Sequence, residues 1–355
     1  MNRRLGRRAH TWLLSIGAFG ALALMSACAG GKSGSASPAV VRAASPTSPA
    51  VSVPAGETPA VAASEAASGT PEGVVAAPAC ARPKPHPGGS TNLTIDGDRK
   101  YILHVPKSYD GTRELPLVIN LHGAGSNAIQ QAFYSGFQTK SDREGFITVT
   151  PDAEGNPQAW NFIPLPSLAD DVGFIRDILG RTEADLCVDP NRVYSTGISS
   201  GAAMSVRLAC SLSDRIAAIG VVSAMWNPPN CPADHMPVLE FHGTADPVVP
   251  FGGGDVATSG IPAPAVETAM AGWAKQDGCG VQAATAQFSQ HVKTETWSGC
   301  GDGALVKLFV IDGGGHTWPG ASVEVPALGA TTDEVSATDQ IWQFFAAHPK
   351  QGASR

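Results

Sequence analysis

The sequence has few basic residues, and none of them form a cluster beyond its first eight positions. It contains 24 Lys and Arg residues against 31 Asp and Glu residues, a net charge of −7. Residues 1–27 carry four arginines and no acidic residue, so the charge becomes −11 if that segment is removed. Nucleic-acid binding needs a concentrated basic surface, and we therefore expect no nucleic acid as a partner.

Short metal and redox motifs are also missing. No two cysteines have the CxxC spacing, and the zinc motif HExxH does not occur. The sequence also has no internal repeat and no heptad pattern. We therefore expect neither a metal nor another cofactor.

The N-terminal apolar run, residues 12–25, is too short and wrongly flanked for a membrane-spanning helix. It follows the basic stretch MNRRLGRR and leads to Cys28, which directly follows small residues. This arrangement predicts a bacterial lipoprotein signal peptide over residues 1–27, with Cys28 as the lipidated first residue of the mature chain. The alternative is an ordinary signal peptide with an incidental cysteine. The protein is then either a lipoprotein on the extracellular face of the membrane, touching it only through this anchor, or secreted.

Residues 28–79 contain almost no aromatic or large aliphatic side chains. Such a segment cannot bury enough apolar surface to offset the entropy lost on ordering. We expect a disordered tether here and a single folded domain over residues 80–350, with no further module. Whether the protein forms oligomers is not decided by the sequence, and a monomer is expected.

Six cysteines remain after Cys28, and an even number in an exported protein favours disulfides. Sequence alone allows fifteen connectivities for six cysteines. The pairing that we favour joins Cys279 to Cys300, Cys210 to Cys231, and Cys80 to Cys187.

The expected domain alternates strands with helices. A hairpin is expected over residues 93–105, and further strands at 115–121, 146–149, 193–196, 217–222, 238–241 and 304–311. Helical patterns occupy residues 171–179, 202–210, 265–275 and 336–347. This alternation predicts an α/β fold with a mostly parallel central sheet and helices on both faces. Active sites in such sheets lie at the carboxyl ends of the strands.

The stretch STGISSGAAMS, residues 195–205, has the pattern of a nucleophile elbow. An apolar strand leads into Gly197, Ser199 and Gly201, and a helix rich in small residues follows. Glycines on both sides let the backbone turn sharply and leave the serine oxygen exposed. We therefore expect Ser199 to be the nucleophile, with Ser200 as the weaker competitor.

A serine nucleophile needs a base and an acid that orients the base. Asp246 follows the expected strand 238–241, and His316 follows the expected strand 304–311 together with three glycines. The order serine, acid, histidine is that of α/β-hydrolases. A loop carboxylate capping a turn remains the alternative for Asp246, and His242 is expected to be structural.

The loop HGAGSN, residues 122–127, follows the strand 115–121 and is rich in small residues. One backbone N–H of an oxyanion hole comes from this position in α/β-hydrolases, and the second comes from the residue after the nucleophile. We expect Ala124 and Ser200 as donors, with Gly123 as the alternative to Ala124.

The motifs LHGAGSN, DDVGFI, RVYSTGISSGAAMS, HGTADPVVPF and GGGHTWPG occur in that order. Over residues 92–346 the chain resembles the poly(3-hydroxybutyrate) depolymerase and feruloyl esterase family of α/β-hydrolases, which includes actinobacterial lipoproteins. The resemblance implies a serine esterase with Ser199, Asp246 and His316 as its triad. Depolymerase-like members often have a cysteine where this chain has Ala124, so the substrate subclass stays open.

The expected substrate is a soluble hydroxycinnamoyl or short hydroxyalkanoate ester. Trp160 and Trp318 are candidates for lining an acyl pocket, with core packing as the alternative. Depolymerisation of solid polyhydroxybutyrate and acyl transfer to a sugar are the competing activities. A non-catalytic binding protein is disfavoured by the complete triad.

Overall fold

The computed structural model describes residues 79–350, except residues 96, 234 and 258. By its internal contacts the chain divides into two units, 1–71 and 72–355, and all described residues belong to the second. The expected signal peptide, Cys28 and nearly all of the expected tether lie outside the described residues.

A ten-stranded sheet forms the centre of the fold, in the order β1-β2-β4-β3-β5-β6-β7-β12-β11-β10. The six strands from β4 to β12 in this order pair in parallel, and the two strands at each end pair antiparallel. The strands are β1 (Gly89–Ile95), β2 (Arg99–Val105), β3 (Leu115–Leu121), β4 (Ile147–Pro151), β5 (Val188–Ile198), β6 (Ala218–Val222), β7 (Val238–Gly243), β10 (Ala284–Gln287), β11 (Val292–Trp297) and β12 (Val306–Ile311). Two short strands, β8 (Gly254–Asp255) and β9 (Pro262–Ala263), form a separate ribbon. The mostly parallel sheet expected from the sequence is confirmed.

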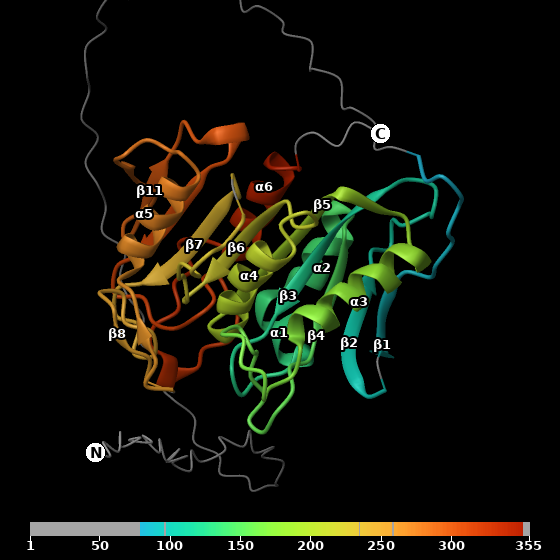
Figure 1. The fold of residues 1–355 in the computed structure, drawn as a ribbon, viewed down its shortest axis with the longest axis horizontal. Coiled ribbons are helices and arrows are strands. Elements are labelled where there is room, and N and C mark those ends of the chain that lie inside the picture. Colours follow the sequence, from blue (N-terminus) through green and yellow to red (C-terminus); the bar gives the residue numbers. More distant parts are fainter. Residues whose placement is uncertain (1–78, 96, 234, 258, 351–355) are drawn as a thin grey trace, which may run out of the picture. The chain divides into compact units, whose positions relative to one another are not determined.

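Helices cover both faces of the sheet (Figure 1). One face packs against α3 (Asp171–Asp185), α4 (Ser200–Ser211) and α5 (Val266–Gln276), and the other packs against α2 (Phe137–Glu144) and α6 (Ala337–Ala347). The helix α1 (Ala128–Ser135) directly precedes α2. Two 3₁₀ turns, η1 (Gly301–Gly303) and η2 (Pro326–Leu328), complete the elements. None of the helices among the described residues has the length and hydropathy needed to span a bilayer.

The strand β3 shows why a continuous apolar run is needed in this fold. Leu117, Ile119 and Leu121 pack into the core on one face of the sheet, whereas Val118 packs into the core on the other. Because successive side chains of a strand point to opposite faces, a strand covered on both faces must be apolar at nearly every position.

Four elements of the sheet and its cover were not expected from the sequence. The helices α1 and α2 carry many polar residues, and all four residues of β10 are exposed. The strand β11 alternates buried with partly buried residues and pairs with β12. All four elements are short, with lengths of eight, eight, four and six residues, so tertiary contacts stabilise them more than local preference does.

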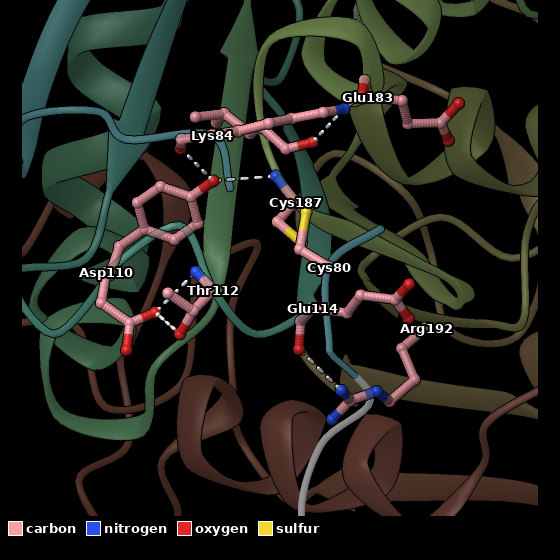
Figure 2. Close-up of a disulfide and its surroundings, with 10 residues drawn as sticks. Cys80, Lys84, Asp110, Thr112, Glu114, Glu183, Cys187 and Arg192 are labelled. Carbon is pink, nitrogen blue, oxygen red and sulfur yellow. Dashed lines mark hydrogen bonds between the residues drawn. A yellow bond between two sulfur atoms is a disulfide. The ribbon is translucent and has the colours of Figure 1, made fainter. Parts of the chain in front are cut away.

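The three disulfides join Cys80 to Cys187, Cys210 to Cys231, and Cys279 to Cys300, which is the favoured pairing. Figure 2 shows the first of them, where the start of the described chain lies against the end of α3. The Tyr109 hydroxyl donates to the Lys84 carbonyl oxygen at 2.9 Å and accepts from the Cys187 N–H at 2.8 Å. The Lys84 ammonium donates to the carbonyl oxygen of Glu183 at 2.5 Å. The disulfide and these bonds fasten the N-terminal segment to the domain.

We expect the double variant Cys80→Ser/Cys187→Ser to lower the free energy of unfolding by about 2–5 kcal/mol, because this disulfide closes a long loop. The two residues are 107 positions apart, whereas Cys279 and Cys300 are only 21 apart. Denaturant unfolding followed by circular dichroism measures the loss, with Cys279→Ser/Cys300→Ser as the matched control. An equal loss in both variants would contradict the loop-length explanation.

Candidate active site

Ser199 lies at the turn between β5 and α4 with backbone angles that are unusual for a serine. Its φ is 58° and its ψ is −123°. Its N–H donates to the carbonyl oxygen of Val222 at 2.9 Å, which ties the turn to the end of β6. A non-glycine residue at positive φ is strained, and an elbow that presents a nucleophile has this geometry.

The glycines on either side of Ser199 lie against the carboxyl end of β3. A Cβ atom at Gly197 would lie 2.6 Å from the Leu121 carbonyl oxygen, and one at Gly201 would lie 2.3 Å from it. A Cβ at Gly201 would also lie 2.5 Å from the His122 carbonyl oxygen. These distances are too short for any side chain, so the G-x-S-x-G spacing serves a close approach of α4 to β3.

Asp246 and His316 lie on neighbouring loops because β7 and β12 are adjacent parallel strands. His316 Nδ1 donates to Asp246 Oδ2 at 2.8 Å, and the two residues are only 4% and 7% exposed. The N–H groups of Val248 and Val249 both donate to Asp246 Oδ1, each at 2.8 Å. Burial alone would raise the pKa of Asp246, but the hydrogen bonds and the charge of His316 outweigh it and lower that pKa. Asp246 is therefore an anion at neutral pH.

The elbow and the Asp246–His316 pair lie at the same edge of the sheet, since β5, β7 and β12 are parallel. The hydrogen bonds of the described residues do not include one between Ser199 Oγ and His316 Nε2. Catalytic hydrogen bonds are often long before substrate binds and shorten in the complex. The structure thus contains the hydrogen bond between His316 and Asp246 and places Ser199 at the same edge of the sheet.

The loop of residues 122–127 runs beside Ser199. A Cβ atom at Gly123 would lie 3.3 Å from the Ser199 Cβ. The Ala153 N–H donates to His122 Nε2 at 3.0 Å, so the ring proton is on Nδ1 and is donated to the Gly123 carbonyl oxygen at 2.7 Å. Burial lowers the pKa of His122, which keeps this ring neutral. The Ala124 N–H, on the same peptide group as the Gly123 carbonyl, points away from His122.

The structure places Trp160 and Trp318 in the core of the domain, and a role of either in lining an acyl pocket stays a prediction. Their exposed fractions are 3% and 1%. Trp160 Nε1 donates to the His122 carbonyl oxygen at 2.8 Å, which holds the 122–127 loop from behind. Trp318 Nε1 donates to Thr338 Oγ1 at 2.9 Å, in the core under α6. Both indoles are covered by protein, and each buried N–H group has a hydrogen-bond partner there.

A buried acid that sequence reasoning missed lies behind Asp246. Glu240 and His242 are two residues apart on β7, and their side chains are fully buried. His242 Nδ1 lies 2.9 Å from Glu240 Oε1, and Nε2 lies 3.5 Å from Asp246 Oδ2. The sequence feature that could have revealed this acid is a Glu and a His two positions apart in an otherwise apolar strand, a spacing that places both side chains on one face of the sheet. Both ring nitrogens of His242 thus face oxygen atoms inside the protein.

Among the residues that the structure describes, no group of three or more His, Cys, Asp or Glu side chains is arranged to hold a metal ion. Asp170 caps the N-terminus of α3 by accepting from the Gly173 N–H at 2.9 Å. Its neighbour Asp171 is buried and pairs with Arg99 at 2.5 Å. Both acids therefore have structural partners at the start of α3.

We expect Gly201→Ala to destabilise the fold by about 1–3 kcal/mol or more, because the new methyl group has no room against β3. The matched control is Gly180→Ala on α3, where a Cβ meets no atom within 4 Å. That variant should be neutral or more stable by up to about 1 kcal/mol. Thermal unfolding compares the two, and a fully stable Gly201→Ala would refute the close-approach explanation.

Comparisons with known proteins agree with this geometry. The family model "Esterase PHB depolymerase" matches residues 99–271. Feruloyl esterase B of Piromyces equi is 35% identical over 234 residues, which make up 61% of this chain and 42% of that protein. The putative esterase NocK of Nocardia uniformis subsp. tsuyamanensis is 31% identical, over 69% of this chain and 78% of that protein. The chain thus spans less than half of the Piromyces protein but most of the Nocardia one.

Two further relatives extend the comparison. A probable feruloyl esterase C of Aspergillus clavatus is 30% identical, over 74% of this chain and 88% of that protein. The solved structure of an acetyl xylan esterase from Aspergillus awamori superposes with a TM-score of 0.52 at 17% identity, covering 73% of this chain and 99% of that one. At that identity the structural likeness concerns the fold alone. Sequence agreement along most of two relatives, together with the elbow after β5, shows that this chain belongs to the esterase PHB depolymerase family, a family of esterases with the α/β-hydrolase fold.

Proposed function

We propose that the protein is a serine carboxylic-ester hydrolase that works through an acyl-enzyme on Ser199. The observation that carries the proposal is the 2.8 Å hydrogen bond from His316 to an ionised Asp246, at the sheet edge where the strained Ser199 elbow ends. A serine at such a turn and a histidine so oriented are the two parts that nucleophilic ester cleavage needs.

In the first half of the reaction, His316 Nε2 accepts the Ser199 hydroxyl proton while Oγ attacks the ester carbonyl carbon. Asp246 holds the imidazole in the tautomer with its proton on Nδ1 and stabilises the cation that forms. The tetrahedral intermediate then collapses, the bond to the alcohol oxygen breaks, and the leaving alcohol takes the proton from Nε2. An acyl-enzyme and a neutral His316 remain.

In the second half, the oxygen of a water molecule attacks the acyl carbon while His316 Nε2 takes a proton from that water. Collapse of the second intermediate returns that proton to Ser199 Oγ and releases the carboxylic acid. The reaction consumes one water for each ester bond and uses no other reagent.

In this proposal, the N–H groups of Ala124 and Ser200 donate hydrogen bonds to the oxyanion of both intermediates. The Ala124 N–H points away from His122, because its peptide carbonyl accepts from that ring. The Ser200 N–H is the first of α4 and has no acceptor within the helix. Donors fixed by helix and loop need no reorganisation when charge develops on the substrate oxygen.

The substrate class in this proposal is a soluble hydroxycinnamoyl or short hydroxyalkanoate ester. Support for it comes from relatives described as feruloyl esterases and from the family described as PHB depolymerase esterases. The three disulfides support an extracellular place of action, because disulfides persist in oxidising compartments. Lipid anchoring through Cys28 belongs to the same proposal.

We expect Ser199→Ala to lower kcat/KM for a chromogenic ester by about 10⁴-fold or more, and His316→Ala to do likewise, since triad residues act as a unit. Asp246→Asn should cost less than either. Ser200→Ala is the matched control, because it removes the neighbouring hydroxyl and keeps the backbone N–H. The proposal fails if Ser200→Ala is inactive while Ser199→Ala turns over normally.

We also expect soluble feruloyl or hydroxybutyrate esters to be hydrolysed much faster than crystalline polyhydroxybutyrate. The described residues form one hydrolase fold and include no second module that could hold a solid surface. Turnover of the soluble esters is compared with the clearing of a polymer suspension by the same enzyme preparation. Rapid clearing of the suspension would contradict the substrate class, and acyl transfer to an added sugar in place of hydrolysis would contradict the reaction.

A further inference from the structure

A chain of buried polar side chains continues behind Asp246, away from His316. His242 Nδ1 lies 2.9 Å from Glu240 Oε1, and His242 Nε2 lies 2.9 Å from the Val249 carbonyl oxygen. The same Nε2 lies 3.5 Å from Asp246 Oδ2, the oxygen that accepts from His316. His242 is therefore in contact with both the turn that carries Asp246 and its carboxylate.

The partners of His242 require one more proton than a neutral imidazole and a carboxylate carry. Both ring nitrogens face oxygen atoms, but a neutral ring has a single N–H. The additional proton lies either on the ring, giving an imidazolium, or on Glu240, which then donates to Nδ1. In both arrangements Nε2 carries a hydrogen that points at Val249 and Asp246.

The electrostatic surroundings favour retention of that proton. Burial raises the pKa of Glu240 to about 6, although the hydrogen bond to His242 opposes the rise. Burial alone would lower the pKa of His242, but its hydrogen bond to Glu240 and the charges of Glu240 and Asp246 raise it. The other groups facing the pair are the Ala224 N–H, from the loop after β6, and the edge of the Phe251 ring.

His242 also braces the turn through Val249. The Val249 carbonyl oxygen accepts from His242, while the Val249 N–H donates to Asp246 Oδ1 at 2.8 Å. Loss of the His242 donor would leave a buried carbonyl without a partner in the same turn that aims the carboxylate. An unpaired buried polar group is costly, so the turn would shift to find another partner.

We propose that His242, held by Glu240, is the positioning residue of this site: its Nε2–H fixes the turn and carboxylate of Asp246 and competes with His316 for Oδ2. The proposal rests on the esterase function proposed above. Competition at Oδ2 weakens the hold of Asp246 on the His316 cation, so His316 gives its proton to the leaving group more readily. Without His242, the cation would persist to higher pH.

The test compares His242→Phe, which keeps the ring and removes both nitrogens, with His242→Gln, whose amide can donate from the ε position. kcat and KM for a soluble ester are measured from pH 5 to 9 with the full chain. For His242→Phe we expect kcat to fall by about 10–100-fold with little change in KM, as for a small misplacement of a catalytic group. The acid limb of its pH profile should move upward by about half to one pH unit.

His242→Gln should recover most of kcat and return the acid limb toward that of the native enzyme. His348→Phe is the matched control, because the His348 ring lies against Phe344 at the end of α6 and its Nδ1 donates to the Phe344 carbonyl oxygen. It should leave the acid limb in place.

A native pH profile in His242→Phe overturns the proposal. Equal losses in His242→Phe and His242→Gln also overturn it, because they indicate packing alone. Should His242→Phe not fold, His242→Leu, which also lacks both ring nitrogens, takes its place, and a native acid limb in that variant overturns the proposal.

Labelling of Ser199 by a fluorophosphonate gives a readout that needs no ester substrate. Its rate depends on the same base, so the acid limb of labelling should shift in His242→Phe as the acid limb of hydrolysis does. If the native enzyme is labelled at Ser199 but hydrolyses no ester in a panel, the proposed function fails, and the labelling profile still tests His242. If the native enzyme is not labelled at Ser199, both proposals fail.

Discussion

The carbonyl oxygens at the end of β3 lie directly against the first turn of α4, and the site depends on this contact. Only glycine fits at positions 197 and 201, because a Cβ at either would lie within 2.6 Å of the Leu121 carbonyl oxygen. The chain between them has to turn within a few residues, which places Ser199 at a positive φ. The same contact brings the 122–127 loop beside Ser199, so one packing constraint positions both Ser199 and the loop proposed to supply an oxyanion donor.

Strand order places the other two residues. Because β7 and β12 are neighbours and parallel, the loops that leave them meet, and Asp246 and His316 form a hydrogen bond although they are 70 residues apart. A buried carboxylate remains ionised only if donors compensate for lost water. Two backbone N–H groups and His316 supply them here, and His242 adds a longer contact. The acid is therefore positioned by its own turn as well as by the base.

The predicted fold was most reliable where strands are buried on both faces. The apolar run LPLVINL predicted a strand buried on both faces. In the structure its successive side chains do pack into the cores on opposite faces of the sheet. The helices α1 and α2 and the edge strand β10 were not predicted, because the helices span only eight residues each and β10 only four, which is too short for a clear pattern. Their positions follow from contacts with the rest of the domain rather than from local preference.

The sequence by itself determined the order of strand, elbow, acid loop and histidine loop, and the glycine spacing around Ser199, because turn geometry and buried strands impose local patterns. The cysteine pairing could be favoured but not decided from it. Only the tertiary structure decided that Trp160 and Trp318 are core residues with buried N–H partners. It alone joined Glu240 to His242 and His242 to Asp246. Burial and the distance between remote loops are set by packing, which local sequence does not encode.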